Sequence, residues 1–219
     1  MRRGCGNTLM RGPRKPLRNE NRDTRGVVRF EGDVKNWPPS VDEGRPKRCV
    51  ACGRGAYEGG GLGLHGHGLV ERQQRGPPTP DGAPECRVVL CRRYRCTPCG
   101  AVMRVVPPSV ARRKHFSGEA IALALTLWAL CGLGAEEVRR RTSDWTRRGD
   151  AARGWRSLAR WAWQLRTREL FGALPLGAVA DGPRTVAARA AQALCGHAPL
   201  AWRSAPLEHQ AFAGARHVS

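Results

Sequence analysis

The pattern of apolar and polar positions changes three times along the chain. Residues 1–46 show no apolar periodicity, residues 47–108 carry short alternating runs, and residues 109–171 carry apolar positions at helical spacing. Residues 172–219 open with a linker punctuated by glycine and proline and then show two weaker helical patterns. Because side chains repeat every two residues along a strand and every 3.6 along a helix, this order predicts an α+β fold in which a small antiparallel ribbon precedes an all-α bundle.

The alternating runs predict strands on either side of tight turns. Residues 88–95 and 102–106 are rich in valine and other residues that favour strands, and residues 76–84 form the loop before them. Residues 59–68 contain too much glycine for a helix. A unit of about 60 residues with so few large apolar side chains needs additional stabilisation, such as a structural metal ion.

The helical segment predicts a buried helix followed by two more polar ones. Ser117 is placed to cap a helix over residues 118–131, whose apolar residues surround it almost completely. Residues 135–141 form a short helix with acids in its first turn and arginines in its last, which suits the helix dipole. Residues 151–171 form a third, with Trp155, Leu158, Trp161 and Leu165 on one face. Two further helices are predicted over residues 183–195 and 207–215.

Charge points to a polyanionic partner. The 219 residues contain 38 Lys and Arg against 18 Asp and Glu, a formal net charge of +20. Nucleic acid is the usual partner of such a chain. Residues 1–46 are predicted to be a disordered basic arm because they cannot bury enough apolar surface to offset chain entropy. They contain no signal-peptide pattern, and the longest uncharged apolar run, residues 120–135, is too short to span a bilayer, so we expect a cytoplasmic protein without membrane contact.

Two copies of the pattern C-x-x-C-G carry the clearest chemistry. Cys49 and Cys52 form the first pair, and Cys96 and Cys99 form the second. Four thiolates are the tetrahedral set that structural Zn²⁺ prefers, and a closed set leaves no open position for catalysis. The sequence therefore predicts a structural zinc ribbon over residues 47–108. Four other residues remain alternative ligands, Cys86, Cys91, His65 and His67, whereas Cys5 is interpreted as a tail thiol and Cys131 and Cys195 as buried helix residues.

Motifs of catalysis are not apparent. The sequence contains no phosphate-binding loop of the G-x-x-x-x-G-K-[ST] type, no H-E-x-x-H and no G-x-S-x-G, and its acids after residue 110 do not form a recognisable acidic triad. We therefore expect a binding protein and not an enzyme.

The order of the three helices in residues 109–171 is that of a helix-turn-helix module. In such a module Arg153, Arg156 and Arg160 of the third helix would read the major groove, and Arg139, Arg140 and Arg141 would contact the DNA backbone. The segment 142–154 is much longer than the usual turn. A plain helical bundle with a solvated arginine face is the alternative.

Several of these features together resemble a known family. The chain resembles the DNA-binding heads of bacterial insertion-sequence transposases in four features. These are the C-x-x-C-G knuckle Cys96–Gly100 preceded by Arg92-Arg93-Tyr94-Arg95, the Val-Pro-Pro segment that follows, the basic segment 112–117 and the apolar helix. The resemblance covers residues 47–171. It implies that ribbon and helices grip duplex DNA, while the separate cutting domain of that family has no counterpart here. The implied DNA contacts are Arg92, Arg93, Arg95, Arg112, Arg113, Lys114, Arg139, Arg140, Arg141, Arg153, Arg156 and Arg160.

Two other functions remain open from sequence. A protein–protein adaptor stabilised by zinc would use an interface of tryptophans, namely Trp128, Trp155, Trp161 and Trp163. An RNA-binding ribbon would stack Tyr94 on a base.

Overall fold

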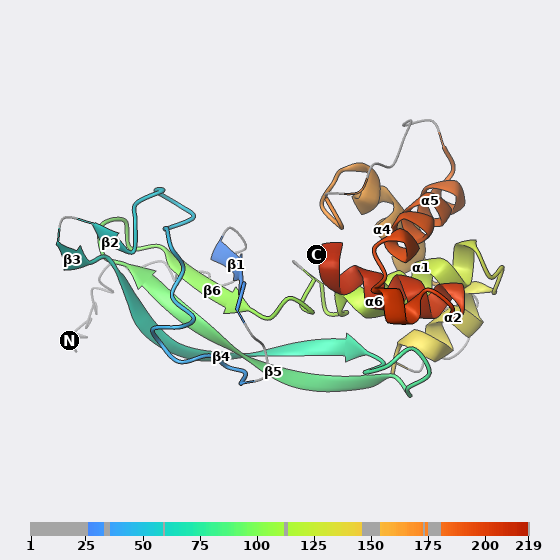
Figure 1. Cartoon of the computed structure of the whole chain (residues 1–219), viewed down its shortest axis with the longest axis horizontal. Helices are drawn as coiled ribbons and strands as arrows, with labels where there is room; N and C mark the ends of the chain where they lie inside the picture. The colour runs from blue at the N-terminus through green and yellow to red at the C-terminus, as the bar shows by residue number, and fades with distance from the viewer. Residues whose placement is uncertain are drawn as a thin grey trace, which may run out of the picture.

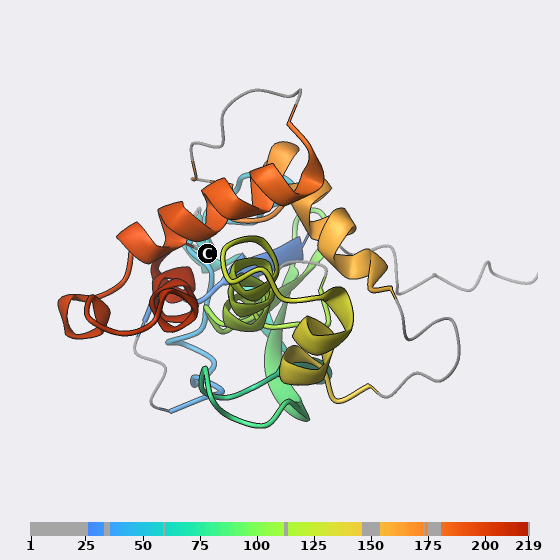
Figure 2. The same cartoon turned by 90° about the vertical axis from the view of Figure 1, so that its right-hand side faces the viewer.

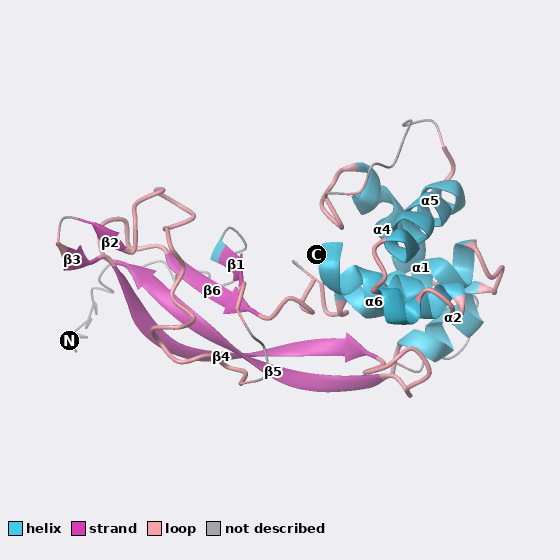
Figure 3. Ribbon diagram, viewed as in Figure 1, coloured by secondary structure: helices cyan, strands magenta, loops and turns pink. Residues whose placement is uncertain are grey.

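The computed structural model describes residues 26–32, 36–58, 60–111, 114–145, 154–172, 174 and 181–218. Strands occupy one side of the molecule and helices the other (Figure 3). The strands are β1 (Val27–Arg29), β2 (Tyr57–Glu58), β3 (Gly61–Leu62), β4 (Leu64–Gly76), β5 (Glu85–Cys96) and β6 (Val102–Val106). The helices are α1 (Gly118–Ala129), α2 (Ala135–Thr142), α4 (Arg156–Arg166), α5 (Pro183–Gly196), the 3₁₀ helix η3 (Leu200–Trp202) and α6 (Leu207–Val218). The predicted α+β class is confirmed.

The main sheet has the strand order β1-β6-β5-β4. β4 and β5 form a long antiparallel hairpin that begins where Leu64 pairs with Cys96 and ends where Gly76 pairs with Glu85. β6 pairs antiparallel with the second half of β5. The hairpin extends from the end of the molecule that holds β2 and β3 to the underside of the helices (Figure 1). With a rise of about 3.3 Å per residue, it spans roughly 36 Å.

The prediction that residues 1–46 are disordered is wrong for those residues of the segment that the structure describes. β1 pairs parallel with β6, and the segment after it crosses one face of the sheet. There the indole Nε1 of Trp37 donates to the Leu90 carbonyl at 2.6 Å, and the Tyr94 hydroxyl donates to the Val41 carbonyl at 2.6 Å. The apolar residues of this segment are single and aperiodic, so only their partners on distant strands reveal their role. Residues 1–25 and 33–35 lie outside the described residues.

α1 forms the centre of the helical bundle. Figure 2 shows it nearly end-on, in yellow-green, between α5, α6, α2 and α4. The Ser117 side chain accepts from the N–H of Ala120 at 3.0 Å, which confirms the predicted cap. Every residue from Gly118 to Leu127 is buried, as the all-round apolar pattern predicted.

The helical prediction needs two corrections. The third helix, predicted over residues 151–171, begins at Arg156 in the described part and ends at Arg166, and Arg168 and Phe171 both have positive φ. The bundle also does not end at residue 171, because α5 and α6 supply much of its core through side chains such as Val186, Leu194 and Phe212. α4 packs chiefly against α5, so residues 109–171 are not a self-contained three-helix unit.

Ribbon and bundle are joined where the hairpin reaches α1. The Arg75 N–H donates to the His115 carbonyl at 2.6 Å, and the Ser117 N–H donates to the Arg75 carbonyl at 3.0 Å. The Arg75 guanidinium pairs with Asp144 at 2.9 Å and lies 4.3 Å from the centre of the Trp145 ring. The far end of the hairpin is therefore held by the helical half of the chain.

Candidate metal centre and basic surfaces

The two cysteine knuckles have the same backbone structure. Gly53 and Gly100 adopt φ values of 74° and 70°. Each glycine N–H donates to the carbonyl of the first cysteine of its knuckle, Cys49 or Cys96, at 2.8 Å. Glycine is required here because a side chain would be strained at this positive φ. This local repeat confirms the turn that the C-x-x-C-G pattern predicted.

The knuckles bring four sulfur atoms together. The Sγ atoms of Cys49, Cys52, Cys96 and Cys99 all lie within 4.8 Å of one another. Contacts across the knuckles are 3.7 Å for Cys49 to Cys99 and 3.8 Å for Cys52 to Cys96. Sulfurs at the corners of a tetrahedron with metal–sulfur bonds of about 2.3 Å lie about 3.8 Å apart. The cluster therefore has the dimensions of a four-thiolate centre and is compatible with a structural metal ion.

The thiols of the cluster differ in acidity before any metal binds. Burial opposes ionisation of Cys49, but the N–H groups of Cys52 and Ala51 and the neighbouring thiols outweigh it and lower the pKa of Cys49 to about 7. Burial, with the neighbouring sulfurs, raises the pKa of Cys96 to about 12. A cation must displace such protons to gain four thiolates, so metal affinity will rise with pH.

The alternative ligands lie outside this cluster. Cys91 is fully buried, and its thiol donates to the Val89 carbonyl at 3.7 Å. Cys86 pairs with Arg75 near the opposite end of the hairpin, and His65 and His67 are exposed on β4. Cys131 was predicted to be a buried helix residue but is exposed just after α1, which ends two residues earlier, whereas Cys195 in α5 is half-buried.

The predicted DNA contacts of the ribbon do not share one face of the sheet. Arg92 donates through Nε to the Pro39 carbonyl at 2.7 Å, so part of its guanidinium is used within the fold. Arg93 and Arg95 lie on the opposite face of β5, because alternate residues of a strand point to opposite sides. Lys114 is half-buried. Arg112, Arg113 and Arg153 lie outside the described residues.

The helical candidates also fall into distinct groups. Arg139 is buried, with 8% of its surface exposed. Arg140 and Arg141 form ion pairs with Glu137 on the same helix. Arg156 and Arg160 are exposed on α4.

The aromatic residues of the alternative functions are mostly used in packing. Trp155 and Trp161 meet Phe116 in a cluster of edge-on rings, with centroids 5.0–5.7 Å apart. Tyr94 is fully buried, so it offers no ring face to a base, and the predicted stacking role is wrong. Trp163 is the exception among these residues, with 55% of its surface exposed.

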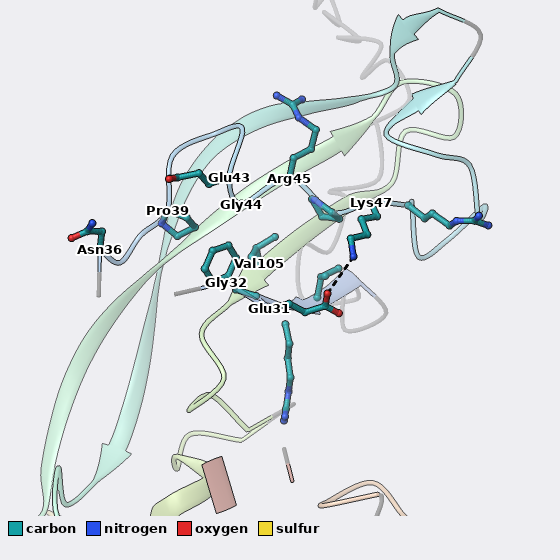
Figure 4. Close-up of a pocket in the computed structure, with 14 residues that line it drawn as sticks. Glu31, Gly32, Asn36, Pro39, Glu43, Gly44, Arg45, Lys47 and Val105 are labelled. Carbon is teal, nitrogen blue, oxygen red and sulfur yellow. Dashed lines mark ion pairs between the residues drawn. The ribbon is translucent and has the colours of Figure 1, made fainter. Parts of the chain in front are cut away.

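A pocket lies beside β1. It is lined by β1, the segment 36–48 and Val105, and the Lys47 ammonium faces Glu31 across it at 3.6 Å (Figure 4). Its charged groups have both signs, and they include Glu43 and Arg48 as well as this pair. The pocket is therefore not lined by groups of a single chemical type.

Comparisons with protein families, curated proteins and solved structures found no match. None of the helices in the described ranges has the length and hydrophobicity that a bilayer span requires.

Proposed function

We propose that this protein binds duplex DNA and that a structural zinc ion holds its ribbon in the binding shape. The observation that carries the proposal is the exposed face of α4. Arg156, Arg160 and Trp163 follow one another at spacings of four and three residues, which places them on one side of the helix. In the described part of the chain, neither arginine has an ion-pair partner. Arginines without acidic partners on a helix of a chain with net charge +20 favour a polyanion.

The role proposed for the metal is structural. The two knuckles supply four thiolates, which complete a tetrahedral zinc shell and leave no position for water or substrate. Zinc is favoured over other ions because thiolate ligands in this arrangement suit it and because its geometry is tetrahedral. The proposed protein therefore resembles the binding head of an insertion-sequence transposase without a cutting domain, and we assign it no catalytic step.

The experiment that tests the function combines metal content with DNA binding. Purified protein is assayed for bound zinc and titrated with a labelled 30-base-pair duplex, before and after treatment with a chelator. We expect one zinc per chain and salt-sensitive binding. Chelation should remove the zinc and weaken DNA binding, because the ribbon then loses its shape while α4 stays folded. A protein that binds no duplex DNA at 50 mM salt would refute the proposal.

A matched pair of variants tests the role of α4. Arg156→Ala with Arg160→Ala should weaken DNA binding by at least about tenfold, since each lost phosphate contact costs affinity at low salt. Arg140→Ala with Arg141→Ala removes the same charge from arginines that are already paired with Glu137, and it should have a smaller effect. Equal effects of the two variants would show that the binding depends on charge alone and not on α4.

A protein-binding role remains the second candidate because Trp163 is exposed. Exposed tryptophan flanked by arginine is also common at protein interfaces. Two results together would favour this candidate. The chain would capture one defined protein in a complex that survives nuclease treatment, and the purified chain would bind no DNA.

A further inference from the structure

The face of the sheet that carries Arg93 gathers several arginines from three strands. Arg93 and Arg104 are direct cross-strand partners between β5 and β6, so their side chains lie on the same face. Arg95 lies two residues along β5 and shares that face. Cα atoms of cross-strand partners are about 5 Å apart, and alternate residues of one strand are about 7 Å apart. The three side chains therefore start from a small triangle on the sheet.

A fourth arginine approaches the same face from β4. Arg72 pairs with Val89, which alternates with Cys91 and Arg93 along β5. The pKa of Arg72 is lowered by burial and by the positive charge of Arg104, so these two cations are near neighbours. Arg72 itself is anchored, because its Nη2 donates to the carbonyls of Ala111 and Lys114 at 3.0 and 2.8 Å. It adds charge to the face while its hydrogen bonds are used within the fold.

The charges of Arg93, Arg95 and Arg104 have no ion-pair partner among the acids that the structure describes. The Nε atom of Arg93 is buried and has no hydrogen-bond partner within the described residues. Like charges placed directly opposite on neighbouring strands destabilise a sheet, so the Arg93–Arg104 pair costs the free protein stability. An arrangement of this kind is stabilised when an anion binds between the guanidinium groups.

We propose that Arg93, Arg95 and Arg104 form a binding site for the phosphate backbone of duplex DNA, separate from the exposed face of α4. The inference rests on the proposed function and specifies one of its surfaces. Arg104 belongs to this site although no sequence motif marks it, and Arg92 does not because it bonds to Pro39 on the other face. Contacts to phosphate position the protein without reading sequence. The site therefore supplies affinity and salt dependence but no preference between base pairs.

The test is a salt titration of DNA binding by the full chain with the variant Arg93→Gln, Arg104→Gln. Each phosphate contact contributes a slope of about −0.9 to the plot of log affinity against log salt, so the slope should fall in magnitude by about 2. Affinity at 0.1 M salt should fall roughly 10- to 60-fold, by the same factor for duplexes of unrelated sequence. The matched control is Arg189→Gln with Arg203→Gln, exposed arginines of the helical half, which should change the slope by less than 0.5 unit.

Folding of the variant is checked on the same sample. Removal of the Arg93–Arg104 repulsion should leave the metal content unchanged and raise the thermal midpoint by about 1–3 °C. A variant that is folded, binds DNA and has the wild-type salt slope would overturn the inference while leaving the proposed function in place. Failure of the wild-type protein to bind DNA would overturn both. Arg93→Lys with Arg104→Lys should keep the slope but lower the affinity, because lysine retains the charge without the planar fork.

Discussion

The ribbon and the helical bundle bury very different amounts of apolar side chain. The bundle has one cluster of 22 buried residues drawn from every α-helix of the described chain, whereas the ribbon has clusters of seven and three. The larger ribbon cluster includes Cys49 and Cys96 themselves. We therefore expect burial alone to stabilise the bundle, and we expect the ribbon to need the metal ion proposed for the four cysteines. Four changes test this difference.

The largest effect is expected from loss of a metal ligand. Cys96→Ser should abolish metal binding and unfold residues 47–106, because zinc–thiolate binding contributes on the order of 10 kcal/mol to small folded metal sites. Amide hydrogen exchange should show fast exchange in β4 to β6 and near-normal protection in α1, α5 and α6. Cys86→Ser is the control, since Cys86 is exposed and outside the cluster. Rapid exchange in the helices as well would show that the bundle cannot stand without the ribbon.

The converse change destabilises the bundle and should leave metal binding by the ribbon unchanged. Gly214 in α6 packs so closely on α5 that an added Cβ would lie 1.9 Å from the Leu194 carbonyl oxygen. Gly214→Ala should therefore lower the free energy of unfolding of the bundle by about 3 kcal/mol, as overpacking of a rigid backbone contact does. Zinc content at room temperature should be unchanged. Gly196→Ala, at a position with open space around it, should have little effect on either property.

An intermediate effect is expected at the junction of the two regions. Gly76 has a φ of 127°, and a Cβ there would lie 2.3 Å from the Cβ of Ala120. Gly76→Ala should destabilise the protein by about 2 kcal/mol, through backbone strain and the clash together. It should also separate one thermal transition into two, measured by calorimetry, as ribbon and bundle lose their coupling. Retention of a single unshifted transition would contradict the junction described above.

The smallest effect concerns a buried acid of the bundle. Burial raises the pKa of Glu119, although Arg216, 3.3 Å away, acts against that shift. Because the pKa of Glu119 is higher in the folded than in the unfolded state, protonated Glu119 favours the folded state. This stabilisation is complete below the unfolded pKa and is lost as pH rises through the folded pKa. Stability should fall by up to about 1.4 kcal/mol per pH unit between those two values. Glu119→Gln should flatten this part of the pH profile, which chemical denaturation at a series of pH values would measure.

Local signals made much of the fold predictable. Ser117 caps its helix, the two C-x-x-C-G knuckles turn as expected, and the strands at residues 88–95 and 102–106 fall inside β5 and β6. These features depend on residues within one turn or one strand of one another. The prediction failed at Tyr94 and Cys131, because burial of a single side chain depends on segments that lie elsewhere in the sequence.

The amino-acid sequence by itself determined the four-cysteine set, the buried character of α1 and the excess of positive charge. Each is a matter of residue type and short spacing. Only the tertiary structure decided that β1 joins the sheet, that α5 and α6 complete the bundle, and that Arg104 lies opposite Arg93 while Arg92 turns to the other face. Strand register and helix packing settle these points, and both depend on contacts between residues far apart in the chain, which no local pattern encodes.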